Sequence, residues 1–165
     1  ERNAFKLIVA ALKKWVWVQW DIEEWEILSA GEPHGQVYLG NGKYLRSVGK
    51  LSIEDYARML AESYAGISLM ASPHPSYPPL EMSVFGVRVI TNTFSNKDLK
   101  NFNDNIVSLK NISPNNIVRN LQNVCDGYRP MVPYENLCPE YCRNENVFSF
   151  IENIKTDLEE WENQL

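Results

Sequence analysis

The sequence has little cysteine, little histidine and no long hydrophobic run. Its 165 residues include three cysteines and two histidines. The cysteines, Cys125, Cys138 and Cys142, are odd in number and loosely spaced, which argues against a disulfide framework. Reduced thiols are favoured over half of a zinc site. The longest apolar stretch, 7–12, is too short to span a bilayer, and no signal peptide opens the chain.

A surplus of positive charge is also absent. There are 16 Lys and Arg residues against 21 Asp and Glu residues, giving a net charge of -5. A nucleic-acid partner is therefore not expected, because binding it needs a basic face that displaces counterions. The 44% of hydrophobic residues is ordinary globular composition. The first residue is Glu1 rather than Met, so we expect a piece of a longer cytoplasmic protein, with peripheral attachment to the inner membrane face as an option.

Hydrophobic spacing and turn residues predict the first elements. Apolar residues at helical spacing predict a helix over 3–18, with Asn3 as its N-cap. Gly40-Asn41-Gly42-Lys43 contains Asn-Gly, which supplies the positive φ angles of a tight hairpin. A capping-box pattern at Ser52-Ile-Glu-Asp55 predicts the start of a second helix, with Asp55 reaching back to the cap amide. The predicted strands of this half are 25–30, 36–39 and 44–48.

The second half alternates short strands with helices. Four prolines in 72–79 predict a rigid loop, since proline fixes φ and removes a donor. A short helix is expected from Pro79 to Gly86, because the proline ring suits a first helical position and glycine suits the C′ position. Ser113-Pro114 opens a further helix. The remaining predicted segments are strands 66–70, 87–91 and 106–109, an irregular stretch 129–145 and a last amphipathic helix over 147–165.

This order of elements predicts an α/β fold: a Rossmann-like, mostly parallel sheet flanked by helices. We divide the chain into one domain, 1–145, and a C-terminal helix, 146–165. In open parallel sheets, ligands bind beyond the carboxyl ends of the strands, where loops run into helices. The proline loop lies at such a place, after strand 66–70.

The segment Ser72-Pro-His-Pro-Ser-Tyr-Pro-Pro-Leu-Glu81 has the residues of an anion site. A stiff loop entering a helix is expected to point unpaired amides at one spot, and the helix dipole adds roughly half a positive charge. A diphosphate fits such a site without a metal. We expect Glu81 in the first helical turn, where it could accept hydrogen bonds from the sugar hydroxyls of a nucleotide. The local pattern alone favours a carboxylate that only complements the dipole.

Four other residues are candidates for the same ligand. Lys50 follows a strand on the same predicted edge and could neutralise a diphosphate, although a solvated surface lysine is commoner. His74 could bond a sugar or phosphate, or be satisfied by neighbouring backbone groups. Ser76 and Tyr77 could donate hydroxyls to phosphate, or merely cap the helix.

The block 66–92 resembles the donor-site segment of GT-B glycosyltransferases, and more narrowly the C-terminal domain of bacterial WsaF-type rhamnosyltransferases. Shorter pieces match in order: Arg2-Asn-Ala-Phe5, Ser47-Val-Gly-Lys-Leu-Ser52 and Asn96-Lys-Asp-Leu99. The resemblance covers about 2–128. It implies the nucleotide-sugar half of a two-domain transferase of cell-surface polysaccharide assembly, with dTDP-L-rhamnose as the inferred donor. It also implies that Lys50 contacts the diphosphate and that Glu81 holds the nucleotide's sugar ring.

Two departures from the family pattern shape our expectations. Pro73 stands where the wider GT-B group has a glutamate that contacts the sugar, so that role has no carrier. The family also has a central strand before the first helix, and a donor-binding arginine after that strand, which this sequence lacks. We therefore expect an opened sheet that pairs differently or associates with another copy. The acceptor domain is missing too, so we expect this piece alone to be inactive and leave the catalytic residues unassigned.

Two other readings remain beside the transferase. The chain could be a non-catalytic α/β interaction module that no longer binds a donor, or an unrelated doubly wound domain such as a flavodoxin-like regulator. A P-loop nucleotidase is disfavoured, because Gly-x4-Gly-Lys-Ser/Thr is absent. No Asp-x-Asp motif is present, and we expect no metal or other cofactor. The early tryptophans are expected in the core and interfaces: Trp15, Trp17, Trp20 and Trp25.

Overall fold

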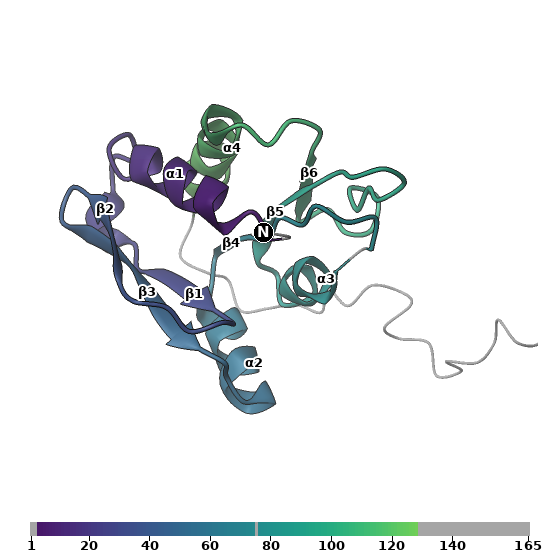
Figure 1. Cartoon of the computed structure of the whole chain (residues 1–165), viewed down its shortest axis with the longest axis horizontal. Coiled ribbons are helices and arrows are strands. Elements are labelled where there is room, and N and C mark those ends of the chain that lie inside the picture. The colour runs from purple at the N-terminus through teal and green to yellow at the C-terminus, as the bar shows by residue number, and fades with distance from the viewer. Residues whose placement is uncertain (1–2, 75, 129–165) are drawn as a thin grey trace, which may run out of the picture.

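The computed structural model describes residues 3–74 and 76–128. The chain runs α1 (Phe5–Trp15), a short 3₁₀ turn (Ile22–Glu24), β1 (Ile27–Ala30), β2 (Val37–Gly40), β3 (Lys43–Gly49) and α2 (Ile53–Glu62). It continues through β4 (Ala65–Ile67), α3 (Tyr77–Val84), β5 (Arg88–Asn92), β6 (Ile106–Leu109) and α4 (Pro114–Asp126) (Figure 1). The predicted irregular stretch and last helix, with Cys138 and Cys142, lie outside the described residues. The α/β class expected from the sequence is confirmed.

The described strands form two three-stranded sheets, which we call sheet A and sheet B. Sheet A has the order β1-β3-β2, with β1 parallel to β3 and β2 antiparallel to it. Sheet B has the order β4-β5-β6 and is parallel throughout. Strands β1 and β4 are therefore edge strands that do not pair with each other. The described strands are thus divided between one mixed sheet and one parallel sheet.

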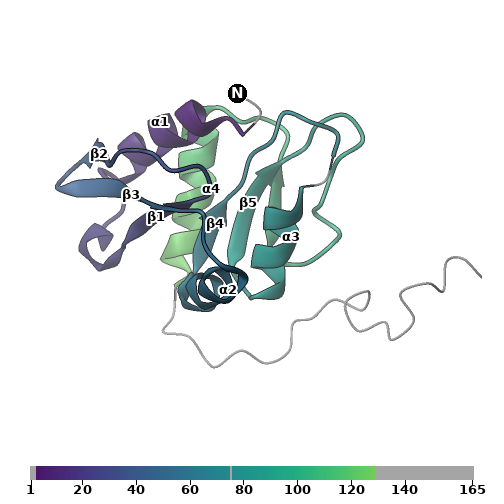
Figure 2. The ribbon, with the colours of Figure 1, turned by 60° about the horizontal axis from the view of Figure 1, so that its bottom comes forward.

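Helices cover both faces of sheet B. On one face, Ile90, Leu109 and Ile117 join the larger core cluster, which continues through α1 into sheet A. On the other face, Val89 packs in a second cluster with residues of α2 and α3 such as Leu60 and Met82. Figure 2 shows α3 beside β5, with α4 behind the sheet. Because the side chains of β5 alternate between the two clusters, this strand is buried on both faces, as in doubly wound folds.

The hairpin predicted around Asn-Gly is confirmed. Asn41 and Gly42 have φ angles of 48° and 70°, the left-handed values that a two-residue hairpin turn requires. The turn is tied to the end of α1, because the Asn41 Nδ2 donates to the Val16 carbonyl at 2.8 Å. On the outer face of this hairpin, Tyr38 and Tyr44 are exposed and their ring centroids lie 5.0 Å apart.

The N-terminus of α1 and the capping contact of α2 differ from expectation. The N-cap of α1 is Ala4, with φ 50°, rather than Asn3, whose side chain accepts from the Phe5 amide at 3.4 Å. At α2, Ser52 is the N-cap as predicted, and its Oγ accepts from the Asp55 amide at 3.1 Å. The Asp55 carboxylate accepts from the Ser52 hydroxyl at 2.9 Å, instead of reaching the cap amide.

Candidate functional site

The proline loop leaves the carboxyl end of β4 and enters α3, the place that the sequence predicted. Met70 precedes the loop, and its amide donates to the Asn92 Oδ1 at 2.8 Å. Of the polar loop residues, His74 is exposed, Ser72 is half-buried and Ser76 is buried. The loop therefore presents His74 at the surface, beyond the ends of β4 and β5, where ligands of parallel sheets bind, whereas the Ser76 side chain faces inward.

Hydrogen bonds between residues two apart in the sequence fix the shape of the loop. The His74 amide donates to the Ser72 Oγ at 3.2 Å, and the Ser76 amide donates to the His74 Nδ1 at 3.1 Å. The rings of His74 and Tyr77 lie edge to face, with centroids 6.1 Å apart. His74 is thus bonded by a neighbouring backbone group, which is the alternative that the sequence left open for it. The structure brings His74, Ser76 and Tyr77 together at one turn.

The expected set of unpaired amides requires a correction. Helix α3 begins at Tyr77, two residues earlier than predicted, because prolines fit its first turn, where amides have no helical partner. Pro78 and Pro79 carry no N–H, and the Ser76 amide is already bonded to His74. Ser76 is the N-cap, with φ 70°, and its side chain makes no capping bond. Among residues 76–79, only Tyr77 keeps a backbone N–H that could bind a ligand.

Glu81 also lies elsewhere in the helix than expected. It is the fifth residue of α3 rather than a first-turn residue, so it does not cap the positive end of the dipole. Its side chain is exposed and accepts a hydrogen bond from the Tyr56 hydroxyl of α2. Burial, followed by the charge and hydrogen bond of Glu81, raises the pKa of Tyr56 to about 12. No sequence pattern indicates this pair, since the two residues lie on different helices.

Lys50 is a surface residue at the end of β3. Its side chain is 78% exposed and its Nζ lies 3.8 Å from a carboxylate oxygen of Glu32. Exposed ion pairs of this kind contribute little to stability, so the lysine is free to exchange partners. Within residues 3–74 and 76–128, no hydrogen bond or ion pair joins Lys50 to Glu81 or to the proline loop. The structure therefore does not link the two residues that the resemblance assigns to the nucleotide.

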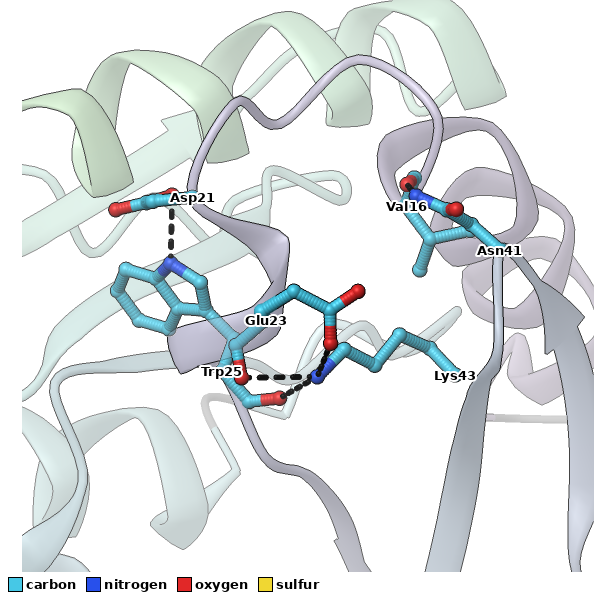
Figure 3. Close-up of polar contacts among 6 residues, drawn as sticks. All are labelled: Val16, Asp21, Glu23, Trp25, Asn41 and Lys43. Atoms are coloured by element: carbon cyan, nitrogen blue, oxygen red, sulfur yellow. Dashed lines mark hydrogen bonds and ion pairs between the residues drawn. The ribbon is translucent and has the colours of Figure 1, made fainter.

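A second polar region lies on sheet A. Lys43 donates from its Nζ to the carbonyls of Glu23 and Trp25 at 3.1 and 3.2 Å, and its Nζ lies 3.6 Å from the Glu23 carboxylate (Figure 3). The Trp25 indole donates to Asp21 at 2.9 Å. A depression of about 440 Å³ adjoins these residues and extends to Arg46. Lys43 and Arg46 are each paired with a glutamate, so both cations of this depression already have a partner.

The four early tryptophans differ in burial, and the one described cysteine lies in the core. Trp15 is buried and Trp25 half-buried, as expected for the core, but Trp17 and Trp20 are 67% and 81% exposed. Cys125 is a free thiol in the core. Burial and the charges of nearby carboxylates raise its pKa to about 12, so it is not a reactive nucleophile.

The described residues contain neither a metal-binding cluster nor a helix that could span a membrane. In 3–74 and 76–128, no group of three or more His, Cys, Asp or Glu side chains is placed to hold a metal ion. In the same part of the chain, no helix is both long enough and apolar enough to cross a membrane.

Comparison with known proteins gives two matches. A family model described as "WsaF, C-terminal domain" matches residues 1–122. A curated relative from Myxococcus xanthus, described as "O-antigen biosynthesis protein RfbC", is 34% identical over 93 residues. That alignment covers 56% of this chain and 7% of the relative, so the chain spans a small part of the relative's length.

Proposed function

Because the chain belongs to the family of WsaF C-terminal domains, we propose that it is the nucleotide-sugar-binding domain of a glycosyltransferase of polysaccharide biosynthesis. The observation that carries this proposal is the family match over the very residues that form the parallel sheet, the proline loop and α3. The printed name of the relative, O-antigen biosynthesis protein, supports the same biological role. We propose dTDP-L-rhamnose as the donor. Our proposed location is the cytoplasm, with peripheral attachment to the inner membrane face as a second option.

In this proposal the donor lies across the carboxyl end of sheet B. The diphosphate approaches the start of α3, where the dipole favours negative charge and where His74, Ser76 and Tyr77 lie together. Lys50 contributes a mobile positive charge after giving up its weak pairing with Glu32. Glu81, held by the Tyr56 hydroxyl, accepts a hydrogen bond from the nucleotide's sugar. No metal is required by this arrangement.

The domain's chemical role would be to stabilise the leaving group. An acceptor hydroxyl attacks the anomeric carbon of the donor sugar, and the bond from that carbon to the diphosphate oxygen breaks. The electron pair stays on the diphosphate, where the helix dipole and Lys50 stabilise the added charge. The acceptor glycan and any general base belong to a second domain, so we propose that this domain alone does not turn over substrate.

The test is calorimetric titration of dTDP into the protein and into two carboxylate variants. We expect wild-type protein to bind, and Glu81→Ala to bind about tenfold more weakly, because one hydrogen bond to a charged group is lost. Glu62→Ala is the matched control, since Glu62 is also an exposed helical carboxylate but lies at the far end of α2. The absence of binding, or equal binding by Glu81→Ala and wild type, would contradict the proposed site.

The second candidate is a non-catalytic interaction module, and one observation favours it. Strands β1 and β4 are edges of their sheets, and their residues Ile27 and Ile67 are only partly buried. An edge strand that no other strand covers can pair with another chain, including a second copy. The same titration separates the two functions, because a module that has lost its donor site gives no heat with dTDP.

A further inference from the structure

Lys97 is a buried cation that has no counter-charge among residues 3–74 and 76–128. It lies in the turn after β5 and is 4% exposed. Lysine is rarely buried unless it is paired. Within residues 3–74 and 76–128 its ammonium has no acidic partner: its Nζ donates to the Met70 carbonyl at 3.1 Å. Burial lowers the pKa of Lys97, as expected for an ammonium removed from water.

A second buried side chain holds the same residue of the main chain. Asn92, the last residue of β5, accepts from the Met70 amide at 2.8 Å and donates to the Met70 carbonyl at 3.2 Å. Asn92 is 3% exposed and also donates to the Thr93 carbonyl at 3.0 Å. Lys97 and Asn92 therefore satisfy both backbone groups of Met70. We call these three residues the Met70 clasp.

The clasp is the point from which the proline loop departs. After Met70, the chain turns through the Ser72 and His74 hydrogen bonds to reach Ser76, which has a φ of 70°. A non-glycine residue keeps such a conformation only when the surrounding structure imposes it. One end of the loop is fixed by α3 and the other by the clasp, so a shift of Met70 would move the groups that face a ligand.

We propose that Lys97 is a positioning residue of the nucleotide-sugar site, acting through the Met70 carbonyl on the proline loop. This inference rests on the proposed function of that loop. A methionine at position 97 would fill similar space without burying a charge, so stability alone does not explain a lysine there. The carbonyl of Met70 can be held by an N–H donor but not by an apolar side chain.

The test compares Lys97→Met with Lys100→Met. Lys100 is the matched control because it lies on the same turn, but its side chain is 60% exposed and pairs with Asp98. Affinity for dTDP is measured by calorimetry well below the unfolding temperature, and Tm by scanning calorimetry. We expect Lys97→Met to bind dTDP about tenfold more weakly with a Tm equal to or above that of wild type, and Lys100→Met to match wild type in both.

The outcomes separate this inference from the proposed function. If wild-type protein does not bind dTDP, the proposed function fails and the positioning role fails with it. If wild type binds and Lys97→Met binds equally well, only the positioning role is overturned, and a lower Tm would then show a purely structural lysine. If Lys97→Met does not fold, Lys97→Leu decides, because its side chain also lacks an N–H donor for the Met70 carbonyl. Weaker dTDP binding by folded Lys97→Leu supports the proposal, and unchanged binding overturns it.

Discussion

At the scale of single residues, the chemistry of the candidate site depends on partners from other elements. The local pattern predicts that Glu81 complements the dipole of its own helix, and the resemblance implies that it holds the nucleotide's sugar ring. In the structure it lies past the first turn and accepts from Tyr56 of α2. From the sequence, Lys97 has no predicted role beyond its place in the matching piece Asn96-Lys-Asp-Leu99. In the structure its side chain is buried and donates to the Met70 carbonyl. Both relationships follow from packing between elements. Local sequence patterns report a residue's own helix or turn, so they could not reveal them.

The Tyr56–Glu81 pair predicts an unusual tyrosine titration. Burial and Glu81 raise the pKa of Tyr56 from 10.0 to about 12, so the folded state favours the neutral phenol. Its contribution to stability is complete below pH 10 and is lost as the pH rises from 10 to about 12. Tyrosinate absorbance at 295 nm, compared between wild type and Tyr56→Phe, should show one tyrosine of the eight titrating near pH 12.

Glu81→Gln provides the control for that titration. Removing the negative charge should lower the midpoint of Tyr56, but the midpoint should stay above 10 because burial is the largest cause of the shift. A difference spectrum that titrates at the ordinary tyrosine value in wild-type protein would show that the two side chains do not meet.

At the scale of elements, sequence patterns were most reliable where a turn residue or a buried face fixes the boundary. Strand β6 has the predicted limits, Ile106–Leu109, and α4 begins at the predicted Ser113-Pro114 pair, with Ser113 as its N-cap. The start of α3 was misplaced because two prolines can occupy any of the first three helical positions. Strand β4 is shorter than the predicted 66–70, since its last part is held by the Asn92 side chain.

The hairpin of sheet A supplies a prediction about stability. Gly40 has a φ of 108°, and a Cβ there would lie 2.6 Å from the Trp17 Nε1. Gly40→Ala should lower the free energy of unfolding by about 1–3 kcal/mol, because it combines backbone strain with a clash. Urea denaturation measures the change. Gly35→Ala is the control, since a Cβ at Gly35 meets nothing within 4 Å, and its effect should stay within about 0.5 kcal/mol. Equal effects of the two substitutions would contradict this account of the hairpin.

At the scale of the whole molecule, the order of elements predicted the α/β class but not how the strands divide. Strand formation depends on local sequence, whereas the separation into sheets A and B depends on which edges find a partner. The proline loop was correctly predicted at the carboxyl end of a parallel strand, because that placement follows from chain order alone. The sequence did not predict which groups the loop offers, since its prolines remove donors and His74 takes another.

The central claim is that a nucleoside diphosphate binds where the proline loop enters α3. The most direct measurement is a titration of isotopically labelled protein with dTDP, followed by amide chemical shifts in heteronuclear NMR spectra. We expect the largest shift changes on the amides of Met70, His74, Ser76 and Tyr77, with the amides of Trp20 and of the residues around Lys43 unchanged. Shifts centred on the Lys43 region, or none at saturating dTDP, would contradict the claim.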